Sequence, residues 1–485
     1  MIMRRMLYGL SMLTAPSALA QTATLDCFAP APGPPAKIAA CSKMLGGASL
    51  PAATRALALF ARAEALKASG DNASALADID AALLIAPGDA AALLARGKLS
   101  DATGNAARAE ADFSAAIAED PALAEAYGLR GALRLKRRAS EDGIADLGEA
   151  RRLNPGDAEV QTQLAAAQLK AGQTADAVAS YAAALAVNPR DASALRGRAT
   201  AYARAQNYPA AVADFSAALN LDSGDIAALE GRGMAALQGG ALAAAIADFS
   251  ALTALRPGDG GAVFFRANAK LQNGDAPGAT EDFSDFLKNH PGDSEALMGR
   301  GLARQSSGDT EGAEADFSTL LVKAPAAAEP RARRGYLRVM RGEYAGAVSD
   351  LAMAMALPDA PPELALWRFI AETRGGQKAE AALAEAAQKV ASREWPAPVM
   401  DYYLGSVSGD AVLAAAAQDP KERPGRLCEA YFYLGQAAII LNNAPEAIKL
   451  FKAALTTGMT RYTEYAGARA ELARLAPHAD ESKPR

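Results

Sequence analysis

The chain has 485 residues, of which 51% are hydrophobic and 6% aromatic, and its formal net charge is −5. No apolar run has membrane-spanning length, so the composition predicts a soluble, mostly helical protein. The acidic balance disfavours nucleic acid as a partner, because proteins that bind its phosphates carry a basic face.

The first twenty residues have the pattern of a secretion signal. Arg4 and Arg5 form a basic start, residues 6–15 are apolar, and residues 18–20 give a small-x-small cleavage pattern before Gln21. This pattern predicts a signal peptide over residues 1–20 and export to the periplasm. Its removal would leave 48 basic residues against 55 acidic ones, a charge of −7.

Two other export features fit the leader less well. Adjacent arginines also begin twin-arginine leaders, but the following Met6, Leu7 and Tyr8 suit a general secretory leader better. A lipidated protein needs a cysteine at the cleavage point itself, whereas the first cysteine here, Cys27, lies beyond it. We therefore expect no lipid anchor.

Two cysteines flank a proline-rich loop within residues 21–55. A bridge between Cys27 and Cys41 would stabilise the chain by roughly 3 kcal/mol in the chain-entropy model, and exported proteins retain such bridges. We predict a disulfide cap on the N-terminal end of the fold. The alternative, a metal pair, lacks a nearby histidine or third cysteine. Cys428 is expected to be a buried free thiol.

From residue 56 to residue 361 the sequence repeats every 34 residues, nine times, with no insertion or deletion. Positions 8 and 20 always hold glycine or alanine and position 24 a bulky residue, as in Gly97, Ala109 and Phe113 of repeat 2. Small residues let two helices approach closely, and the bulky one fills the space between hairpins. The pattern predicts helical hairpins that must stack, because one hairpin cannot bury its apolar face alone.

This pattern resembles the tetratricopeptide repeat (TPR). The resemblance implies an all-α superhelical solenoid, with about nine regular repeats over residues 56–361, a degenerate C-terminal repeat region and a capping helix. It also implies a scaffold that binds other proteins or peptides.

An arginine at position 7 and an aspartate at position 23 recur in eight of the nine repeats, and repeat 4 has lost both, with Leu164 and Ser180 in their place. The joint loss predicts that the two side chains meet across the hairpin, because removing one would leave a buried charge unpaired. The alternative is a charged stripe that binds a ligand, but strict recurrence favours packing. The predicted ladder pairs Arg62 with Asp78, Arg96 with Asp112, Arg130 with Asp146, Arg198 with Asp214, Arg232 with Asp248, Arg266 with Asp282, Arg300 with Asp316, and Arg334 with Asp350.

The TPR resemblance also implies a concave binding face, built mainly from positions 2, 5, 9, 12 and 13 of the first helix in each hairpin. Such a face suits an extended peptide or an amphipathic helix, with apolar anchors and a basic patch that selects an acidic segment. The alternative is that some of these apolar residues only seal neighbouring helices. The candidate groove residues are Phe60, Leu94, Met234, Phe264, Met298, Leu302 and Tyr336, with Lys136, Lys170, Arg196 and Arg204 in the basic patch.

Beyond residue 361 the 34-residue period breaks. Residues 362–427 begin with a helical-pair pattern and become irregular and proline-bearing over 391–427. A last repeat-like segment and a closing helix are expected at 428–475, and 476–485 is expected to be a disordered tail. Terminal repeats depart from the pattern because one side faces solvent.

A second resemblance rests on residues of this C-terminal region. They are Trp367, Glu394, Trp395, Pro396, Tyr403, Leu404, Gly405, Ser408, Glu429, Phe432, Tyr433, Leu434, Gly435, Leu450, Phe451, Lys452, Glu464, Ala468, Glu471 and Leu472. In order and spacing they resemble the C-terminal part of new lipoprotein I (NlpI-like proteins). That resemblance implies a periplasmic adaptor that brings murein hydrolases and a processing protease together. Trp395, Tyr403 and Tyr433 are either packing residues, which we favour, or partner contacts.

No group of residues predicts catalysis. The two histidines, His290 and His478, lie in a turn and in the tail, away from any nucleophile, and no phosphate-binding glycine loop or metal-ligand spacing appears. We expect no catalytic, metal or cofactor site, and predict a non-catalytic envelope adaptor. The alternatives are a structural component of an export or polysaccharide-secretion machine, and a hydrolase with an unrecognised site. The pattern leaves the oligomeric state open.

Overall fold

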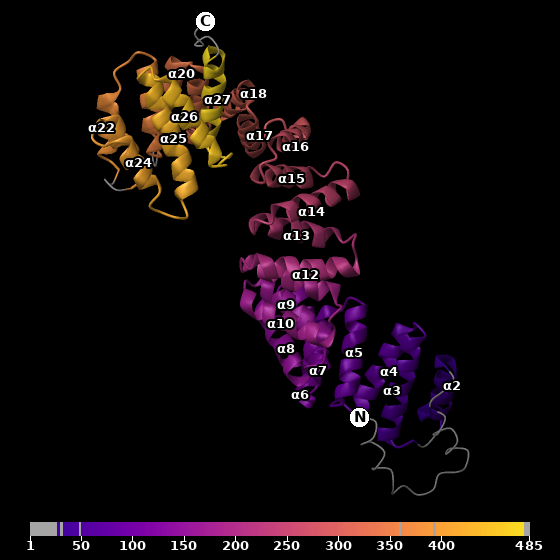
Figure 1. The fold of residues 1–485 in the computed structure, drawn as a ribbon. Coiled ribbons are helices and arrows are strands. Elements are labelled where there is room, and N and C mark those ends of the chain that lie inside the picture. Colours follow the sequence, from indigo (N-terminus) through magenta and orange to yellow (C-terminus); the bar gives the residue numbers. More distant parts are fainter. Residues whose placement is uncertain (1–26, 30–32, 48–49, 358–359, 391–393, 480–485) are drawn as a thin grey trace. The chain divides into compact units, whose positions relative to one another are not determined.

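The computed structural model describes residues 27–29, 33–47, 50–357, 360–390 and 394–479. Within them lie 26 helices and no strand, which confirms the all-α class (Figure 1). None of these helices combines the length and apolar character needed to cross a membrane. The predicted signal peptide lies outside the described residues. The chain divides into two compact units, one ending at Ser223 and one beginning at Gly224, and each is described by itself.

The N-terminal unit consists of one short helix, α2 (Pro34–Leu45), followed by five helical hairpins. Within the unit each helix contacts the next one along the chain, so the hairpins stack in sequence order. The hairpins are α3 (Ala52–Ala68) with α4 (Asn72–Ile85), α5 (Ala90–Ala102) with α6 (Ala106–Glu119), α7 (Ala124–Lys136) with α8 (Ser140–Leu153), α9 (Ala158–Lys170) with α10 (Thr174–Val187), and α11 (Ala192–Arg204) with α12 (Tyr208–Leu221).

The C-terminal unit contains four more hairpins and then seven helices of uneven length. The hairpins are α13 (Ile226–Gln238) with α14 (Leu242–Leu255), α15 (Gly260–Gln272) with α16 (Ala276–Asn289), α17 (Ser294–Ser307) with α18 (Thr310–Lys323), and α19 (Ala328–Arg341) with α20 (Tyr344–Met355). The remaining helices are α21 (Glu363–Arg374), α22 (Glu380–Ala387), α23 (Ala397–Tyr403), α24 (Gly409–Ala416), α25 (Arg423–Ile440), α26 (Ala444–Thr456) and α27 (Thr463–Ala479).

Capping residues explain where the repeat helices begin and end. The Asp89 side chain accepts hydrogen bonds from two backbone amides at the start of α5, and Asp293 does the same for the Ala296 amide of α17. These bonds satisfy amides that have no partner within the helix. At the other end, Gly308 and Gly342 adopt φ of 94° and 83°, a left-handed conformation that glycine adopts without strain and that ends α17 and α19.

The glycine at position 8 leaves room for the bulky residue at position 24. A β-carbon added at Gly97 would lie 2.6 Å from Phe113 Cε1, and one at Gly301 would lie 2.6 Å from Phe317 Cε1. The two phenylalanines are buried. At these two glycines a larger side chain would therefore collide with the ring, and the column as a whole holds only glycine and alanine.

Cys27 and Cys41 form a disulfide at the start of the described chain. Both cysteines are buried with Met44 and Ala58, which places α2 against α3 as a cap on the first hairpin. The free cysteine of the described residues, Cys428, is also buried, and burial raises its pKa to about 12. Such a thiol is inert at neutral pH.

Two expectations about the C-terminal region differ from the structure. The segment 391–427, expected to be irregular, contains α23 and α24. Helix α24 begins where the Ser408 side chain accepts a hydrogen bond from the Ala411 amide, an N-cap that the sequence analysis overlooked. The closing helix, expected to end at residue 475, continues to Ala479, and residues 480–485 lie outside the described chain.

Candidate functional site

The arginines at position 7 and the aspartates at position 23 lie opposite each other in eight hairpins. In each pair, Nε and Nη2 of the arginine bond to the two carboxylate oxygens at 2.6–3.0 Å. The eight aspartates are buried, so this ladder faces the protein interior. Bidentate pairs of this kind fix two helices in one register.

Repeat 4 shows what replaces the pair when both charges are absent. Ser180 is buried, and its hydroxyl donates a 2.8 Å hydrogen bond to Gln168 Oε1 on the facing helix. Arg151 of the preceding repeat donates to the same hydroxyl at 3.0 Å. Leu164 is buried as an apolar residue. In this repeat a hydrogen bond between Ser180 and Gln168 therefore replaces the Arg–Asp ion pair, and neither position 7 nor position 23 holds an unpaired charge.

Four of these aspartates contact a second cation that was not predicted from the sequence. Position 11 holds a basic residue whose nitrogen lies 2.7–2.8 Å from the aspartate of the same repeat. The four residues are Arg134, Lys270, Arg304 and Arg338. The signal was present in the sequence, since these four are the basic residues at position 11, one helical turn after the position-7 arginine.

Glutamates at position 21 form ion pairs between neighbouring repeats at two junctions. Glu110 of repeat 2 bonds to Arg134 and Arg137 of repeat 3, at 2.9 and 2.5 Å. Glu314 of repeat 8 bonds in the same way to Arg338 and Arg341 of repeat 9, at 3.0 and 2.5 Å. Only these two repeats carry glutamate at position 21. The matching residue types at both junctions were visible in the sequence but were not used.

The predicted groove residues of the N-terminal unit divide between the core and the surface. Leu94 is buried and Phe60 half-buried, and both pack with the core of the first three repeats. Lys136, Lys170 and Arg204 occupy position 13 of three successive repeats and are exposed. Lys136 Nζ lies 3.8 Å from an Asp101 oxygen, and Arg204 Nη1 donates to the Leu169 carbonyl at 2.7 Å. Arg196 is half-buried.

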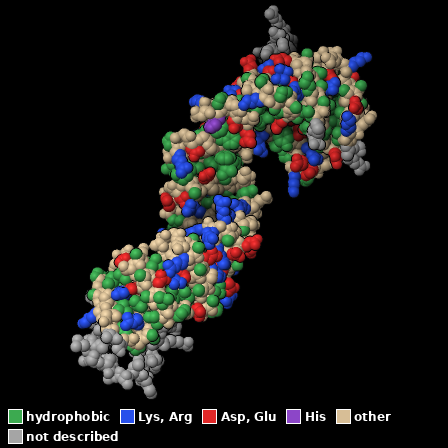
Figure 2. All heavy atoms as spheres, turned by 180° about the vertical axis from the view of Figure 1, so that it is seen from behind, with side chains coloured by type: hydrophobic (Ala, Val, Ile, Leu, Met, Phe, Trp, Pro, Cys, Tyr) green, Lys and Arg blue, Asp and Glu red, His purple; other side chains and the backbone are tan. Residues whose placement is uncertain are grey.

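In the C-terminal unit the predicted groove residues remain partly accessible in repeats 6 to 8. Met234, Phe264, Met298 and Leu302 are half-buried. The Phe264 ring packs within 5.2 Å of the Phe286 ring, measured between centroids. On the face drawn in Figure 2, apolar side chains are interspersed with charges of both signs.

Tyr336 is not a freely exposed groove residue. Its side chain is only 7% exposed and its ring lies 4.8 Å from the Trp367 ring, between centroids. Helix α27 also lies against this part of the repeats, because Arg469 donates to the Ser306 carbonyl and Arg474 to the Met340 carbonyl. Ser306 and Met340 stand at position 13, one of the predicted groove positions. The chain therefore covers part of its own groove in repeats 8 and 9.

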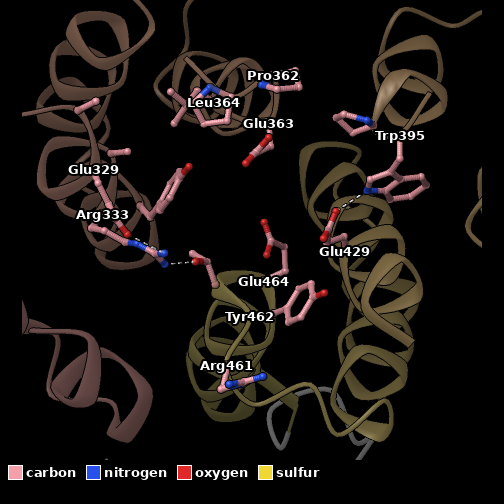
Figure 3. Close-up of a pocket in the computed structure, with 16 residues that line it drawn as sticks. Glu329, Arg333, Pro362, Glu363, Leu364, Trp395, Glu429, Arg461, Tyr462 and Glu464 are labelled. Carbon is pink, nitrogen blue, oxygen red and sulfur yellow. Dashed lines mark hydrogen bonds and ion pairs between the residues drawn. The ribbon is translucent and has the colours of Figure 1, made fainter. Parts of the chain in front are cut away.

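A cavity of about 700 Å³ opens beside Tyr336 (Figure 3). Its walls come from α19, from the starts of α21 and α27, from the segment before α23, and from α25. Four glutamates line it, Glu329, Glu363, Glu429 and Glu464. This concentration of carboxylates could not be seen in the sequence, because the four residues are spread over 136 positions, from 329 to 464.

Two of these glutamates are held by the two tryptophans of the chain. Trp367 Nε1 donates to Glu464 Oε1 at 3.1 Å, and Tyr433 OH donates to the same oxygen at 3.0 Å. Trp395 Nε1 donates to Glu429 Oε2 at 2.5 Å. Burial raises the pKa of Glu464, and burial followed by repulsion from Glu464 raises the pKa of Glu429 to about 8. Burial disfavours the charged form of each.

The aromatic residues of the C-terminal region mostly pack inside the unit. Tyr433 is fully buried, and Tyr403 OH donates to the Tyr433 carbonyl at 2.7 Å. Trp395 is half-buried and lines the cavity. The packing interpretation fits Tyr403 and Tyr433, whereas Trp395 keeps one accessible side.

Comparison with known proteins gives partial matches. The model of the tetratricopeptide repeat family matches residues 60–124, 162–226 and 266–328. The lipoprotein NlpI homolog of Haemophilus influenzae is 30% identical over 120 residues, which are 24% of this chain and 38% of that protein. The chain thus spans little more than a third of the curated relative it matches.

Solved structures of similar fold cover larger shares of the chain at lower identity. YrrB, a TPR protein with an unusual peptide-binding site, is 22% identical and covers 36% of this chain and 90% of its own, with a TM-score of 0.34. The C-terminal part of a TPR repeat-containing protein from Cytophaga hutchinsonii is 16% identical, and the match covers 51% of this chain and 98% of that part, with a TM-score of 0.41. The stacked hairpins and the three matched segments together identify the chain as a tetratricopeptide repeat protein, and over part of its length it is a distant relative of the lipoprotein NlpI homologs.

Proposed function

We propose that this protein is a non-catalytic scaffold of the periplasm that holds peptide segments of cell-envelope proteins in the groove of its repeats. The observation that carries the proposal is the set of half-buried apolar side chains at positions 5 and 9 of repeats 7 and 8, namely Phe264, Met298 and Leu302. They keep an accessible side although the hairpin cores beneath them are closed. Apolar anchors on successive helices suit an extended peptide or an amphipathic helix.

The periplasmic location rests on three observations that support one another. Residues 1–20 have the pattern of a signal peptide. The Cys27–Cys41 disulfide suits an oxidising compartment. The relative from Haemophilus influenzae is named a lipoprotein homolog. We infer that envelope enzymes, with murein hydrolases and a processing protease as candidates, are the partners.

The exposed cations of the N-terminal unit support an acidic partner segment for that part of the groove. Lys136, Lys170 and Arg204 stand at the same position of three successive repeats. A row of positive charge attracts and orients a negatively charged segment, and its contribution falls as salt rises.

A site-specific crosslinking experiment tests the proposal. A photoreactive residue at Met298 is compared with one at Val322, which lies in the same repeat but is 81% exposed on the second helix of the hairpin. In living cells we expect envelope proteins to crosslink at Met298 and not at Val322. Equal capture at both positions would contradict the groove. Capture of an outer-membrane pore or a synthase subunit would instead favour an export or polysaccharide-secretion machine.

A further inference from the structure

The cavity of the C-terminal unit is an extension of the repeat groove. The wall supplied by α19 includes Glu329, Ala332 and Tyr336, which occupy groove positions 2, 5 and 9 of repeat 9, together with Ala328 and Arg333. The facing walls come from the segments that follow the repeats. A partner segment lying along the groove positions of repeat 9 would therefore reach this cavity.

Its floor and rim differ in accessibility. Tyr336, Leu364 and Glu464 form a buried floor, whereas Glu329 and Arg461 stand exposed at the rim. The volume of about 700 Å³ gives room for a long side chain together with part of its backbone. The site is therefore a pocket open to solvent rather than a closed void in the core.

Two carboxylates in the cavity differ in how they are hydrogen-bonded. Glu464 is 7% exposed, Trp367 and Tyr433 both donate to its Oε1, and its own backbone amide is a further donor to the carboxylate. Glu363, at the start of α21, accepts no hydrogen bond or ion pair from another described residue, and its carboxylate points into the cavity (Figure 3). The half-buried Glu363 carboxylate is therefore free to accept a donor from a ligand.

Carboxyl groups outnumber cations in the cavity after its internal pairs are counted, and the cavity becomes more negative as pH rises because the pKa values of Glu429 and Glu464 are raised. Arg333 is held by Glu329 Oε1 at 3.4 Å and by Thr463 Oγ1 at 3.0 Å. This leaves Glu363, Glu429 and Glu464 with Arg461 as the one remaining cation among the lining residues described. Arg461 is exposed at the rim, so its charge is screened by water.

Aromatic rings complete the lining. Tyr336, Trp395 and Tyr462 border the same space as the glutamates. Carboxylates beside aromatic faces are the combination that recognises an ammonium or guanidinium group, through charge and through the negative face of the rings. A metal ion fits less well, because no group of three or more His, Cys, Asp or Glu side chains in the described chain is arranged to hold one.

We propose that this cavity binds a lysine or arginine side chain of the partner polypeptide. The proposal rests on the proposed scaffold function and adds a specificity to it: the segment that reaches repeat 9 carries a basic residue. Glu363 and Glu464 receive the cationic head, and Trp395 and Tyr462 contact the side chain that carries it.

Proton linkage follows from the burial of these glutamates. Because the pKa of Glu429 is raised to about 8, a cation that binds beside it stabilises the charged form and releases a proton. The groups that face Glu429 are Glu363, Glu464, Trp395 and Arg426. Affinity for a basic side chain should therefore increase as pH rises from 6 to 8.

Tryptophan fluorescence provides a direct readout, because the chain has only two tryptophans and each donates to one of the buried glutamates. The full-length protein is titrated with acetyl-Gly-Gly-Lys-Gly-Gly-amide. Two control peptides replace the lysine. Norleucine keeps a side chain of similar length without the charge, and glutamate carries a negative charge. We expect a saturable change in fluorescence with the lysine peptide and none with the control peptides. The affinity for the lysine peptide should be higher at pH 8 than at pH 6.

Two variants distinguish binding in the cavity from attraction of the peptide to any acidic side chain. Glu363 and Glu380 are each the first residue of a helix, α21 and α22, but only Glu363 lines the cavity. Glu363→Gln should weaken binding of the lysine peptide by about tenfold, and Glu380→Gln should leave it unchanged. Glu464→Gln, which keeps an oxygen for the two donors, should weaken binding further, provided that its melting temperature shows a folded unit.

The result that would overturn the inference is an equal response to the lysine and norleucine peptides, or equal affinity in the two first-residue variants. This failure is distinguishable from failure of the scaffold function. If envelope proteins crosslink at Met298 while the lysine peptide leaves the fluorescence unchanged, the groove proposal is supported and the cation-site proposal is contradicted. If the lysine peptide binds but Met298 captures nothing, the cation-site proposal is supported and the groove proposal is contradicted.

Discussion

Arg96 joins two repeats through a single guanidinium. Its Nε and Nη2 bond to Asp112 of the same hairpin at 3.0 and 2.6 Å, and its Nη1 bonds to Asp80 of the preceding repeat at 2.9 Å. In other repeats a serine takes the place of Asp80, as Ser318 does for Arg334 at 3.1 Å. In these repeats the arginine therefore holds its own hairpin closed and links it to the preceding repeat.

Repeat 4 supplies the design for testing the ladder. Arg96→Leu alone leaves Asp112 buried without its partner and should destabilise the N-terminal unit by roughly 3 kcal/mol. The double variant Arg96→Leu with Asp112→Ser copies the Leu164 and Ser180 of repeat 4 and should recover at least about 1 kcal/mol. Urea unfolding followed by circular dichroism measures both. A double variant less stable than the single one would show that the pair does not couple in this way.

Because position 8 lies close to position 24, a glycine-to-alanine substitution should lower stability at position 8 and raise it at an uncrowded helical glycine. At Gly301 a β-carbon would meet Phe317 at 2.6 Å, so Gly301→Ala should destabilise by roughly 1–3 kcal/mol. Gly148, also inside a helix, has no neighbour within 4 Å of an added β-carbon. Gly148→Ala should instead stabilise by about 0.5–1 kcal/mol, because alanine favours helix. Thermal unfolding checks both, and equal effects would refute the packing argument.

The junction between repeats 8 and 9 should depend on salt. Glu314 pairs with Arg338 and Arg341, which are partly exposed. Glu314→Gln should therefore destabilise the C-terminal unit by only about 0.5–1 kcal/mol at low salt and by less in 1 M NaCl. Glu110→Gln is the matched variant in the N-terminal unit. An effect that grows with salt would point to packing rather than charge.

The buried glutamates of the cavity make stability pH-dependent. The pKa of Glu429 lies at about 8 against an ordinary value of 4.5, because of burial and of repulsion from Glu464 and Glu363, partly offset by Trp395 and Arg426. The folded chain then holds a proton that the unfolded chain releases above pH 4.5. Its stabilising contribution is complete below that pH and is lost as pH rises through about 8.

We therefore expect the C-terminal unit to become less stable between pH 5 and pH 8, by on the order of 1 kcal/mol per pH unit for each such proton. Glu429→Gln keeps an acceptor for Trp395 and cannot ionise, so its stability should vary less over this range. Urea unfolding monitored by tryptophan fluorescence at pH 5, 6.5 and 8 measures the slope. A slope unchanged by the substitution would place the titrating proton elsewhere.

The repeat region could be predicted from the sequence because the same residue types recur every 34 residues. Nine copies of one column show which residue types a position tolerates, so the joint loss at Leu164 and Ser180 was enough to predict that Arg96 and Asp112 face each other. The same comparison at position 11 reveals the second cation, since Arg134 stands one helical turn after the ladder arginine.

The cavity could not be predicted in that way. Glu363 and Glu464 occur once each, outside the periodic segment, and the contacts of α21 and α27 with α19 and α25 bring them to one space. Nothing local to Glu464 marks it as buried, because a glutamate in the first turn of a helix is a common surface residue. The burial of Tyr336 escaped prediction for the same reason, since its cover comes from residues far along the chain.

Hydrogen exchange of the full-length protein, alone and with the envelope protein that crosslinks most strongly at Met298, tests the central claim most directly. The account predicts slower exchange in the first helices of the hairpins, α15 and α17, and unchanged exchange in the second helices, α16 and α18. Protection confined to the second helices, or none in either set, would contradict a scaffold that binds its partner in the groove.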